Sequence, residues 1–411
     1  MILIFLTSGL FLGWSLGAND ASNVFGTAVG SKMVSFRKAA IIASIAVILG
    51  AVMQGGGTSG TLSKLGGVNA IGGAFTLAFS TAVVVYIMTK FSLTVSTSQA
   101  IVGAIIGWNL FTGNKTDTEA LAKIVSAWIT GPIIGALFAV VLYIIIIKIK
   151  KSANIHLFKF ESYIRTGLII VGALGAYSLG ANNIANVMGV FIPSFNLDPL
   201  DLKLFTLSSN QQLFLLGGIA IAVGIITYSK KVMETVGGRI MELTPEAAMV
   251  VVLAQAIVLF IFSSSGLSNF LVGLGLPPIP MAPVSSTQII VGCIIGIGIY
   301  KGVSNINFKT LREIGIGWIT SPVLAGTLSF IMLFFMKNIF GINVGRNVNE
   351  VDYAPQTIDY TAMAEISYVF KHLLFIVIIV CLVGFFLYFM LERKKEKEFR
   401  LSEEKFWKSM K

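Results

Sequence analysis

Residues 15–20 of the chain read SLGAND, and residues 178–183 read SLGANN. Both copies lie within long apolar runs, where a buried aspartate or asparagine is rare and costly. A second motif is duplicated in the same order, because VSTSQAIVG at residues 95–103 returns as VSSTQIIVG at residues 284–292. This internal repeat decides the fold.

A third motif extends the repeat to most of the chain. WITGP at residues 128–132 returns as WITSP at residues 318–322, so the halves at about 1–150 and 160–340 are copies with different loop lengths. The apolar runs place five membrane crossings in each half. Because five is an odd number, the second copy must lie upside down relative to the first. Inverted repeats with broken helices are typical of secondary transporters.

The composition indicates a membrane protein. Of the 411 residues, 55% are hydrophobic and 12% are charged, whereas soluble domains have about 25% charged residues. The mean hydropathy of +0.86 predicts an all-α polytopic membrane protein. The two cysteines, Cys293 and Cys381, lie in apolar runs and offer no disulfide framework. The first residues lack a basic stretch and a cleavage motif, so we expect a retained membrane segment there.

The apolar runs predict about 11 to 12 transmembrane segments. They lie at residues 2–30, 38–54, 70–89, 91–110, 121–147, 162–192, 205–228, 245–262, 280–300, 313–336 and 366–391. The runs at 91–110 and 280–300 either cross fully or enter the membrane and return. Most of the 30 Lys and Arg residues fall in alternate loops, which places the N-terminus outside and the C-terminus in the cytoplasm. The net charge of +11 therefore reflects membrane orientation and does not indicate nucleic-acid binding.

These features divide the chain into six parts. They are a first inverted transmembrane repeat (1–150), a basic cytoplasmic linker (151–161), a second inverted repeat (162–337), an external loop (338–365), an additional transmembrane helix (366–391) and a charged cytoplasmic tail (392–411).

The SLGAND and SLGANN motifs are candidate cation sites. Gly17 permits a helix to unwind, and asparagine or aspartate can cap the half-helix that follows. Unwound carbonyls together with side-chain oxygens form the kind of cage that a small hard cation prefers. Asp20 is the one carboxylate inside a predicted crossing and away from its ends. The expected cation ligands are Asn19, Asp20, Asn23, Asn182, Asn183 and Asn186. The alternative is that these residues only cap a kinked helix.

The duplicated Ser/Thr motifs are candidate anion sites. Each precedes an apolar helical run, so its hydroxyls and free N–H groups lie at a helix N-terminus, where the helix dipole attracts an anion. Neither motif contains Lys or Arg. Two inverted copies would point two helix N-termini at one tetrahedral oxyanion. The expected ligands are Ser96, Thr97, Ser98, Gln99, Ser285, Ser286, Thr287 and Gln288. The alternative is that the hydroxyls only join neighbouring membrane helices.

Three stretches resemble the inorganic phosphate transporter family, the Pit-type sodium- or proton-coupled phosphate permeases. They are GANDASNVFGTAVGS at residues 17–31, the two Ser-Thr-Gln motifs, and GGRIMELTP at residues 237–245. The resemblance covers nearly the whole chain. It implies phosphate uptake at the cell membrane, an inverted-repeat helical fold and a homodimer. It also implies that the motifs bind phosphate and the coupling cation.

The chain departs from this family at two places that bear on the coupling ion. Asn183 stands where many relatives repeat the aspartate, and the sequence SIAV at residues 44–47 replaces a stretch that often carries a glutamate. Fewer carboxylates leave fewer proton carriers, so we expect sodium coupling. Proton coupling through Asp20 alone is the alternative.

Other functions fit the sequence less well. A transporter of another tetrahedral oxyanion, such as sulfate or arsenate, would share the same motifs. A channel fits poorly, because occluded sites in broken helices suit coupled transport. We expect no enzyme and no cofactor, since the sequence contains no Cys–His pair, no H-E-x-x-H motif and no nucleotide-binding loop.

Overall fold

The computed structural model divides the chain into two units, Met1–Gln356 and Thr357–Lys411. The first unit is described over residues 2–91, 95–152, 157–201, 203, 205–236, 240–302 and 306–345. In the second unit the described residues, 368–372, 374–376, 379, 383 and 390, are all helical, within the expected transmembrane helix at 366–391. Most of the expected external loop and the whole expected tail (392–411) lie outside the described residues.

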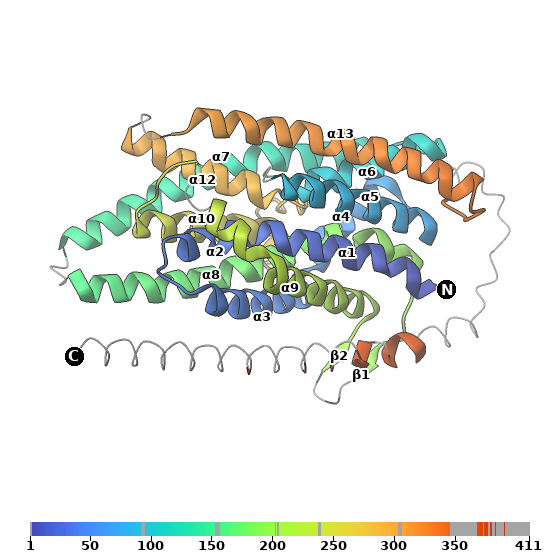
Figure 1. Ribbon diagram of the computed structural model, residues 1–411, viewed down its shortest axis with the longest axis horizontal. Coiled ribbons are helices and arrows are strands. Elements are labelled where there is room, and N and C mark those ends of the chain that lie inside the picture. Colours follow the sequence, from blue (N-terminus) through green and yellow to red (C-terminus); the bar gives the residue numbers. More distant parts are fainter. Residues whose placement is uncertain are drawn as a thin grey trace, which may run out of the picture. The chain divides into compact units, whose positions relative to one another are not determined.

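The described part of the first unit is almost entirely helical (Figure 1). The first half contains α1 (Ile2–Asp20), α2 (Ser22–Gly30), α3 (Phe36–Gln54), α4 (Gly56–Gly66), α5 (Ile71–Lys90), α6 (Thr97–Thr112) and α7 (Thr118–Ser152). The second half contains α8 (Leu157–Met188), a 3-10 helix η1 (Gly189–Ser194), α9 (Ser209–Val236), α10 (Pro245–Ser263), α11 (Ser265–Gly273), α12 (Ser286–Lys301) and α13 (Phe308–Asn338). Between η1 and α9, β1 (Leu200–Asp201) and β2 (Thr206–Leu207) form a small antiparallel ribbon.

Seven helices of the described residues are long and apolar enough to cross a membrane. They lie at Phe36–Gln54, Ile71–Lys90, Thr118–Ser152, Lys159–Ser194, Ser209–Met233, Pro245–Ser263 and Phe308–Asn338. Helices α6 and α12 are apolar but have only 16 residues each, which gives about 24 Å against a hydrocarbon thickness of about 30 Å. Their first residues are buried. The segments 91–110 and 280–300 are therefore not continuous spanning helices, because α6 and α12 begin only at the buried residues Thr97 and Ser286.

The helices of the two halves pack in exchanged pairs. Helix α1 packs on α9, and α8, which carries the second copy of its motif, packs on α3. In the same way α6 packs on α13 and α12 packs on α7. Two copies of one unit make such exchanged contacts when a two-fold axis relates them. The motif helices also run antiparallel, because Asp20 contacts Asn183 while Phe25 lies against Gly172 and Gly9 against Phe191.

Repeated glycines let these helices approach closely. A Cβ atom on Gly17 would overlap the backbone carbonyl oxygen of Ile221, and one on Gly180 would overlap that of Val47. Close backbone approach at small residues is the usual way in which membrane helices associate. We expected the motifs to break their helices with Gly17 as the point of unwinding, but Gly17 lies inside α1, and the helix is interrupted directly after the first motif, at Ala21. Only Ala21 separates α1 from α2, its φ of −60° and ψ of −26° are helical, and α8 continues without a break through the second motif to Met188.

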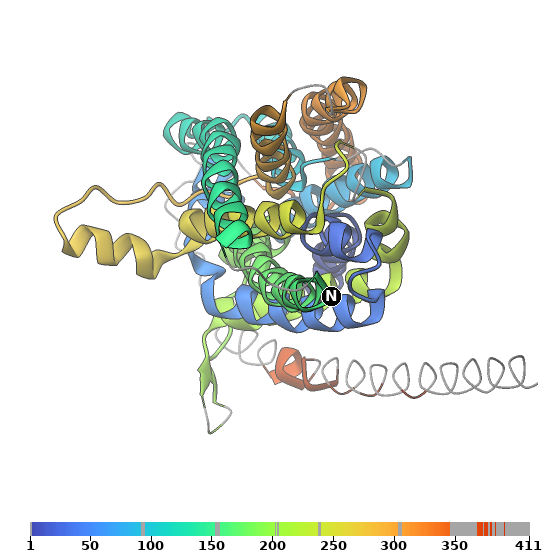
Figure 2. The ribbon, with the colours of Figure 1, turned by 90° about the vertical axis from the view of Figure 1, so that its left-hand side faces the viewer.

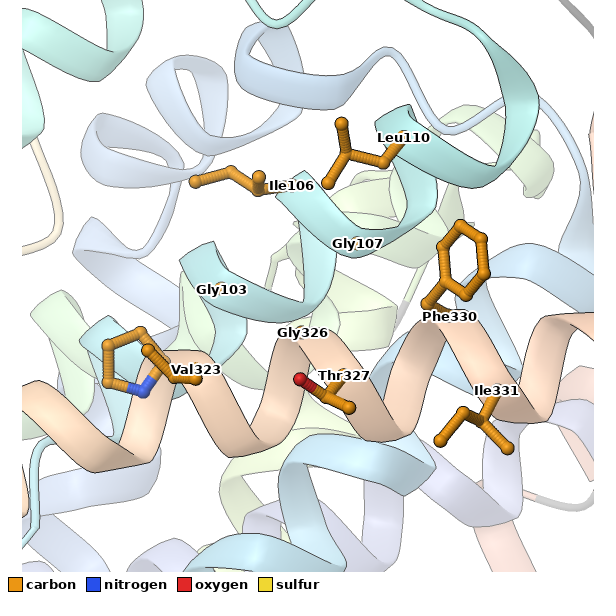
Figure 3. A pocket seen from close by; sticks show the side chains of 10 residues that line it. Gly103, Ile106, Gly107, Leu110, Val323, Gly326, Thr327, Phe330 and Ile331 are labelled. Carbon is orange, nitrogen blue, oxygen red and sulfur yellow. The ribbon is translucent and has the colours of Figure 1, made fainter.

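Two further features of the described residues lie away from the duplicated motifs. Helix α11 follows α10 where the first half passes directly from α5 towards α6, and Figure 2 shows it in gold, extending sideways from the other helices. A groove of about 470 Å³ lies between α6 and α13, as Figure 3 shows. Its lining is apolar apart from Thr327, so it offers no ligands to an ion. The buried polar side chains gather elsewhere.

Candidate functional site

Asp20, the last residue of α1, lies in a buried polar cluster. Its side chain is only 2% exposed. One carboxylate oxygen accepts a hydrogen bond from Asn19 Nδ2 at 2.8 Å. The other accepts from Asn183 Nδ2 at 2.8 Å and from Ser286 Oγ at 3.2 Å. Both SLGAN motifs and one Ser/Thr motif therefore meet at a single carboxylate.

The asparagines one turn further along connect each half to the helix start of the other half. Asn23 Nδ2 donates to the hydroxyl oxygens of Ser286 and Thr287, at 3.3 Å each. Asn186, its counterpart, donates from Nδ2 to Ser98 Oγ at 2.8 Å. The two halves thus hold each other by matching contacts.

The segments before α6 and α12 are held in the same paired manner. Asn19 Nδ2 lies 3.4 Å from the carbonyl oxygen of Val95, and Asn182 Nδ2 lies 2.7 Å from that of Val284. Across the two halves, Ser98 Oγ donates to the Val284 carbonyl and Thr287 Oγ1 to the Val95 carbonyl, both at 3.1 Å. These four bonds bring the N-termini of α6 and α12 together at the cluster.

The expected helix starts are confirmed. Ser96 precedes α6 and accepts a hydrogen bond from the backbone N–H of Gln99 at 3.2 Å, and Ser285 precedes α12 and accepts one from Gln288 at 3.2 Å. The first N–H groups of a helix have no partner within it. All eight residues of the predicted anion motifs are buried. The structure therefore places two positive helix ends in one polar interior.

The symmetry of the cluster breaks where the sequence of the two motifs differs. Ser286 donates to Asp20, whereas the hydroxyl of Thr97, its counterpart, has no hydrogen-bond partner among the described residues. Several buried oxygens in or beside the cluster share this lack of a partner: Thr97 Oγ1, Gln99 Oε1, Asn186 Oδ1, Gln255 Oε1 and Gln288 Oε1. Buried polar atoms without partners require an explanation, and hard cations bind through oxygen ligands.

The charge of Asp20 has no protein counterpart. Asp20 and Glu246 are the only charged side chains buried within the described ranges. Glu246 forms an ion pair with Lys150, but the contacts of Asp20 are amides and a hydroxyl. A buried carboxylate without a cation is costly. In the same ranges no three His, Cys, Asp or Glu side chains gather as a metal site. The side chains around Asp20 offer one carboxylate with amide and hydroxyl oxygens, which are ligands that a hard cation prefers.

All 14 predicted site residues lie in or next to this cluster, and three further residues belong to it. Thr89 Oγ1 donates to the Val85 carbonyl at 2.7 Å and lies 3.4 Å from Asn19 Oδ1. Thr58 Oγ1 donates to the Asn182 carbonyl at 3.3 Å, and Gln255 Nε2 donates to the Ser286 carbonyl at 3.4 Å. Gln255 carries a signal in the sequence, because it is an amide within an apolar helix. The two threonines carry none, since threonine is common in membrane helices.

The fold and the cluster define a class, a multi-pass membrane protein with a buried polar site between its helices. A family model described as "Phosphate transporter family" matches residues 16–269 and 279–410 of the chain. The chain belongs to that family. The residues that the match omits, 270–278, lie at the end of α11 and just after it.

Individual relatives agree with this assignment. A protein of Pyrococcus furiosus named "Putative phosphate permease" is 26% identical over 416 residues, which cover 83% of this chain and 97% of that protein. One of Methanocaldococcus jannaschii with the same description is 29% identical over 329 residues, covering 80% and 95%. A solved structure titled "The sodium-dependent phosphate transporter" has the same fold, with a TM-score of 0.65, 23% identity, and coverage of 82% of this chain and 99% of that chain.

Proposed function

We propose that this chain is a secondary active symporter that imports inorganic phosphate together with sodium ions. The observation that carries the proposal is a buried carboxylate, Asp20, without a cationic partner, next to two opposed helix N-termini. Membership of the phosphate transporter family supports phosphate as the substrate.

In this proposal the SLGAND and SLGANN motifs hold sodium. Asp20 supplies the charge, and the asparagines of both motifs supply amide oxygens. In the described arrangement Asn19 and Asn183 point their N–H₂ groups at Asp20, so these amides turn when a cation arrives. Asn186 Oδ1 and Thr97 Oγ1, which have no partner among the described residues, are ligands that need not give up a hydrogen bond.

Phosphate binds between the starts of α6 and α12. The hydroxyls of Thr97, Ser98, Ser286 and Thr287 and the first backbone N–H groups of both helices donate to its oxygens. No buried Lys or Arg helps to neutralise it within the described residues. Bringing an unpaired anion into a low-dielectric interior costs many kcal/mol. Bound sodium removes much of this cost, and this is the physical origin of the coupling.

The two repeats give this site alternate access to the two sides. Sites at the interface of inverted repeats open to one side at a time when one repeat rocks against the other. The proposal includes the division of the chain at 1–150 and 162–337 and assigns no chemical step to the protein.

Uptake of labelled phosphate into proteoliposomes tests the proposal. We expect concentrative uptake when an inward sodium gradient is imposed, and none when potassium replaces sodium. Asp20→Asn should abolish sodium-driven uptake. Asp117→Asn is the matched control, because Asp117 accepts from the first N–H groups of α7 at the protein surface and asparagine caps a helix equally well. Unchanged sodium-driven uptake by Asp20→Asn would refute the role of Asp20.

Proton coupling is the second candidate, because a single carboxylate suffices to carry one proton. An inward proton gradient without sodium distinguishes the two. Uptake driven by the proton gradient alone would show that protons, and not sodium ions, are the coupling ions. Competition by unlabelled sulfate or arsenate tests the choice of oxyanion, and we expect sulfate not to compete.

A further inference from the structure

Gln255 is a buried amide in the middle of an apolar helix. Helix α10 reads PEAAMVVVLAQAIVLFIFS, and Gln255 in it is only 1% exposed. Burying an amide in an apolar environment is unfavourable unless its hydrogen bonds are satisfied. Its Oε1 atom has no partner among the described residues. A buried oxygen without a partner requires an explanation, and use in another state of the protein is one.

The other end of this amide contacts the proposed site. Gln255 Nε2 lies 3.4 Å from the carbonyl oxygen of Ser286, the first residue of α12. The hydroxyl of the same serine donates to Asp20 at 3.2 Å and accepts from Asn23. Gln255 therefore holds the backbone of the residue whose side chain contacts the only carboxylate of the cluster.

This contact exists in one half only. Helices α5 and α10 follow the N-cap residues Ala70 and Thr244, and Thr81 lies as far from the first cap as Gln255 lies from the second. The hydroxyl of Thr81 donates to the carbonyl of Leu77 within its own helix. Among the described residues, the amide of Gln255 thus supports the start of α12, where Ser286 contacts Asp20, and Thr81 makes no such contact with the start of α6.

A serine hydroxyl has a single hydrogen to donate. While Asp20 carries no cation, that hydrogen of Ser286 points at the carboxylate. A cation bound to Asp20 attracts the oxygen of the hydroxyl and repels its hydrogen, which then needs another acceptor. Gln255 Oε1 is a buried acceptor without a partner in the described part of the chain, on a side chain already bonded to Ser286.

We propose that Gln255 is a positioning residue for the cation site, which fixes the Ser286 backbone and accepts the Ser286 hydroxyl hydrogen when a cation occupies Asp20 and phosphate is not yet bound. The inference rests on the proposed binding of sodium at Asp20. It adds to the cation site a residue from outside the duplicated motifs, on α10.

The test is the thermal unfolding of the purified full chain at increasing sodium chloride, with choline chloride keeping the ionic strength constant and phosphate left out. A ligand that binds the folded state raises the unfolding temperature according to its affinity. We expect Gln255→Leu, which removes both the donor and the acceptor, to raise the half-saturating sodium concentration about fivefold, as for one lost hydrogen bond. Gln255→Glu keeps an acceptor oxygen, and its carboxyl either retains an O–H donor when neutral or adds a charge that attracts sodium when ionised, so it should bind sodium at least as tightly as the wild type. Thr81→Val, the matched control, should leave the sodium response unchanged.

Three results would overturn the inference. If Gln255→Leu and Gln255→Glu weaken sodium binding equally, the donated bond to the backbone matters and the transfer of the hydrogen does not occur. If Gln255→Leu lowers the unfolding temperature without sodium but leaves the half-saturating concentration unchanged, the residue only supports the fold. If sodium fails to stabilise even the wild type, sodium coupling itself is refuted. If the wild type responds to sodium and Gln255→Leu responds equally, only this inference is refuted.

Discussion

The substitution Asn183→Asp tests how the cluster distributes charge. Asn183 Nδ2 lies 2.8 Å from Asp20 Oδ2 and donates a hydrogen bond to it. An aspartate at this position replaces the donor by a second acceptor with a negative charge. The two carboxylates would then face each other inside the protein, where no lysine or arginine is buried among the described residues.

The repulsion can be worked from this distance. Two unit charges 2.8 Å apart repel by about 6 kcal/mol at an effective dielectric constant of about 20. Relaxation to about 4 Å still leaves about 4 kcal/mol. The pair therefore cannot remain doubly charged alone, and either a shared proton or an additional bound cation relieves the repulsion. In the sodium-coupled account the second carboxylate is a further sodium ligand. We expect Asn183→Asp to bind one more sodium ion than the wild type.

The assay is the ratio of labelled sodium to labelled phosphate taken up by proteoliposomes in the initial phase. The ratio should rise by about one in Asn183→Asp if repulsion of this size is relieved by a cation. Asn338→Asp is the control, because it adds the same charge at the exposed end of α13. An unchanged ratio in an active Asn183→Asp protein, with an unchanged dependence on sodium concentration, would refute the reasoning.

Three further predictions concern packing, the helix starts and assembly. Gly17→Ala should destabilise the protein by about 1–3 kcal/mol or more, because the new methyl group would overlap the Ile221 carbonyl, whereas Gly60→Ala, which would meet no atom within 4 Å, should be neutral or stabilising in thermal unfolding. Ser285→Ala removes the cap of α12 and should cost about 1 kcal/mol of stability together with a weaker apparent affinity for phosphate in uptake assays; an unchanged affinity would separate the cap from phosphate binding. The family resemblance implies a homodimer, so the molecular mass in detergent should be twice that of the chain, and a monomer of full transport activity would contradict this expectation.

The cluster was predicted because its residues carry strong local signals. Asparagine, aspartate and runs of hydroxyl residues are rare inside apolar segments, and their duplication placed them at one interface. The contact between Asp20 and Ser286, residues far apart in the chain, follows from two inverted copies meeting at their motifs. Ser96 and Ser285 were expected at helix starts because serine before an apolar helix is a good N-cap, and both accept the expected bond.

The remaining features depend on contacts that local sequence does not specify. The sequence suggested that the glycines of the motifs break their helices, but the same residue also allows close packing, and here packing decides, because a carbonyl of a partner helix lies against Gly17 and Gly180. Whether the segment at 280–300 spans the membrane depends on where its helix begins. The helix begins at Ser286 because Ser285 caps it and because Val284, two residues earlier, is hydrogen-bonded to Asn182 of α8.

The central claim is that sodium and phosphate bind together in one buried cluster. Calorimetric titration of phosphate into the purified chain, with sodium varied against choline, tests it most directly. Because coupling between two ligands is reciprocal, the account predicts that phosphate binds more tightly as sodium rises and that Asp20→Asn removes this dependence. Equal phosphate affinity with and without sodium in the wild type would contradict the account.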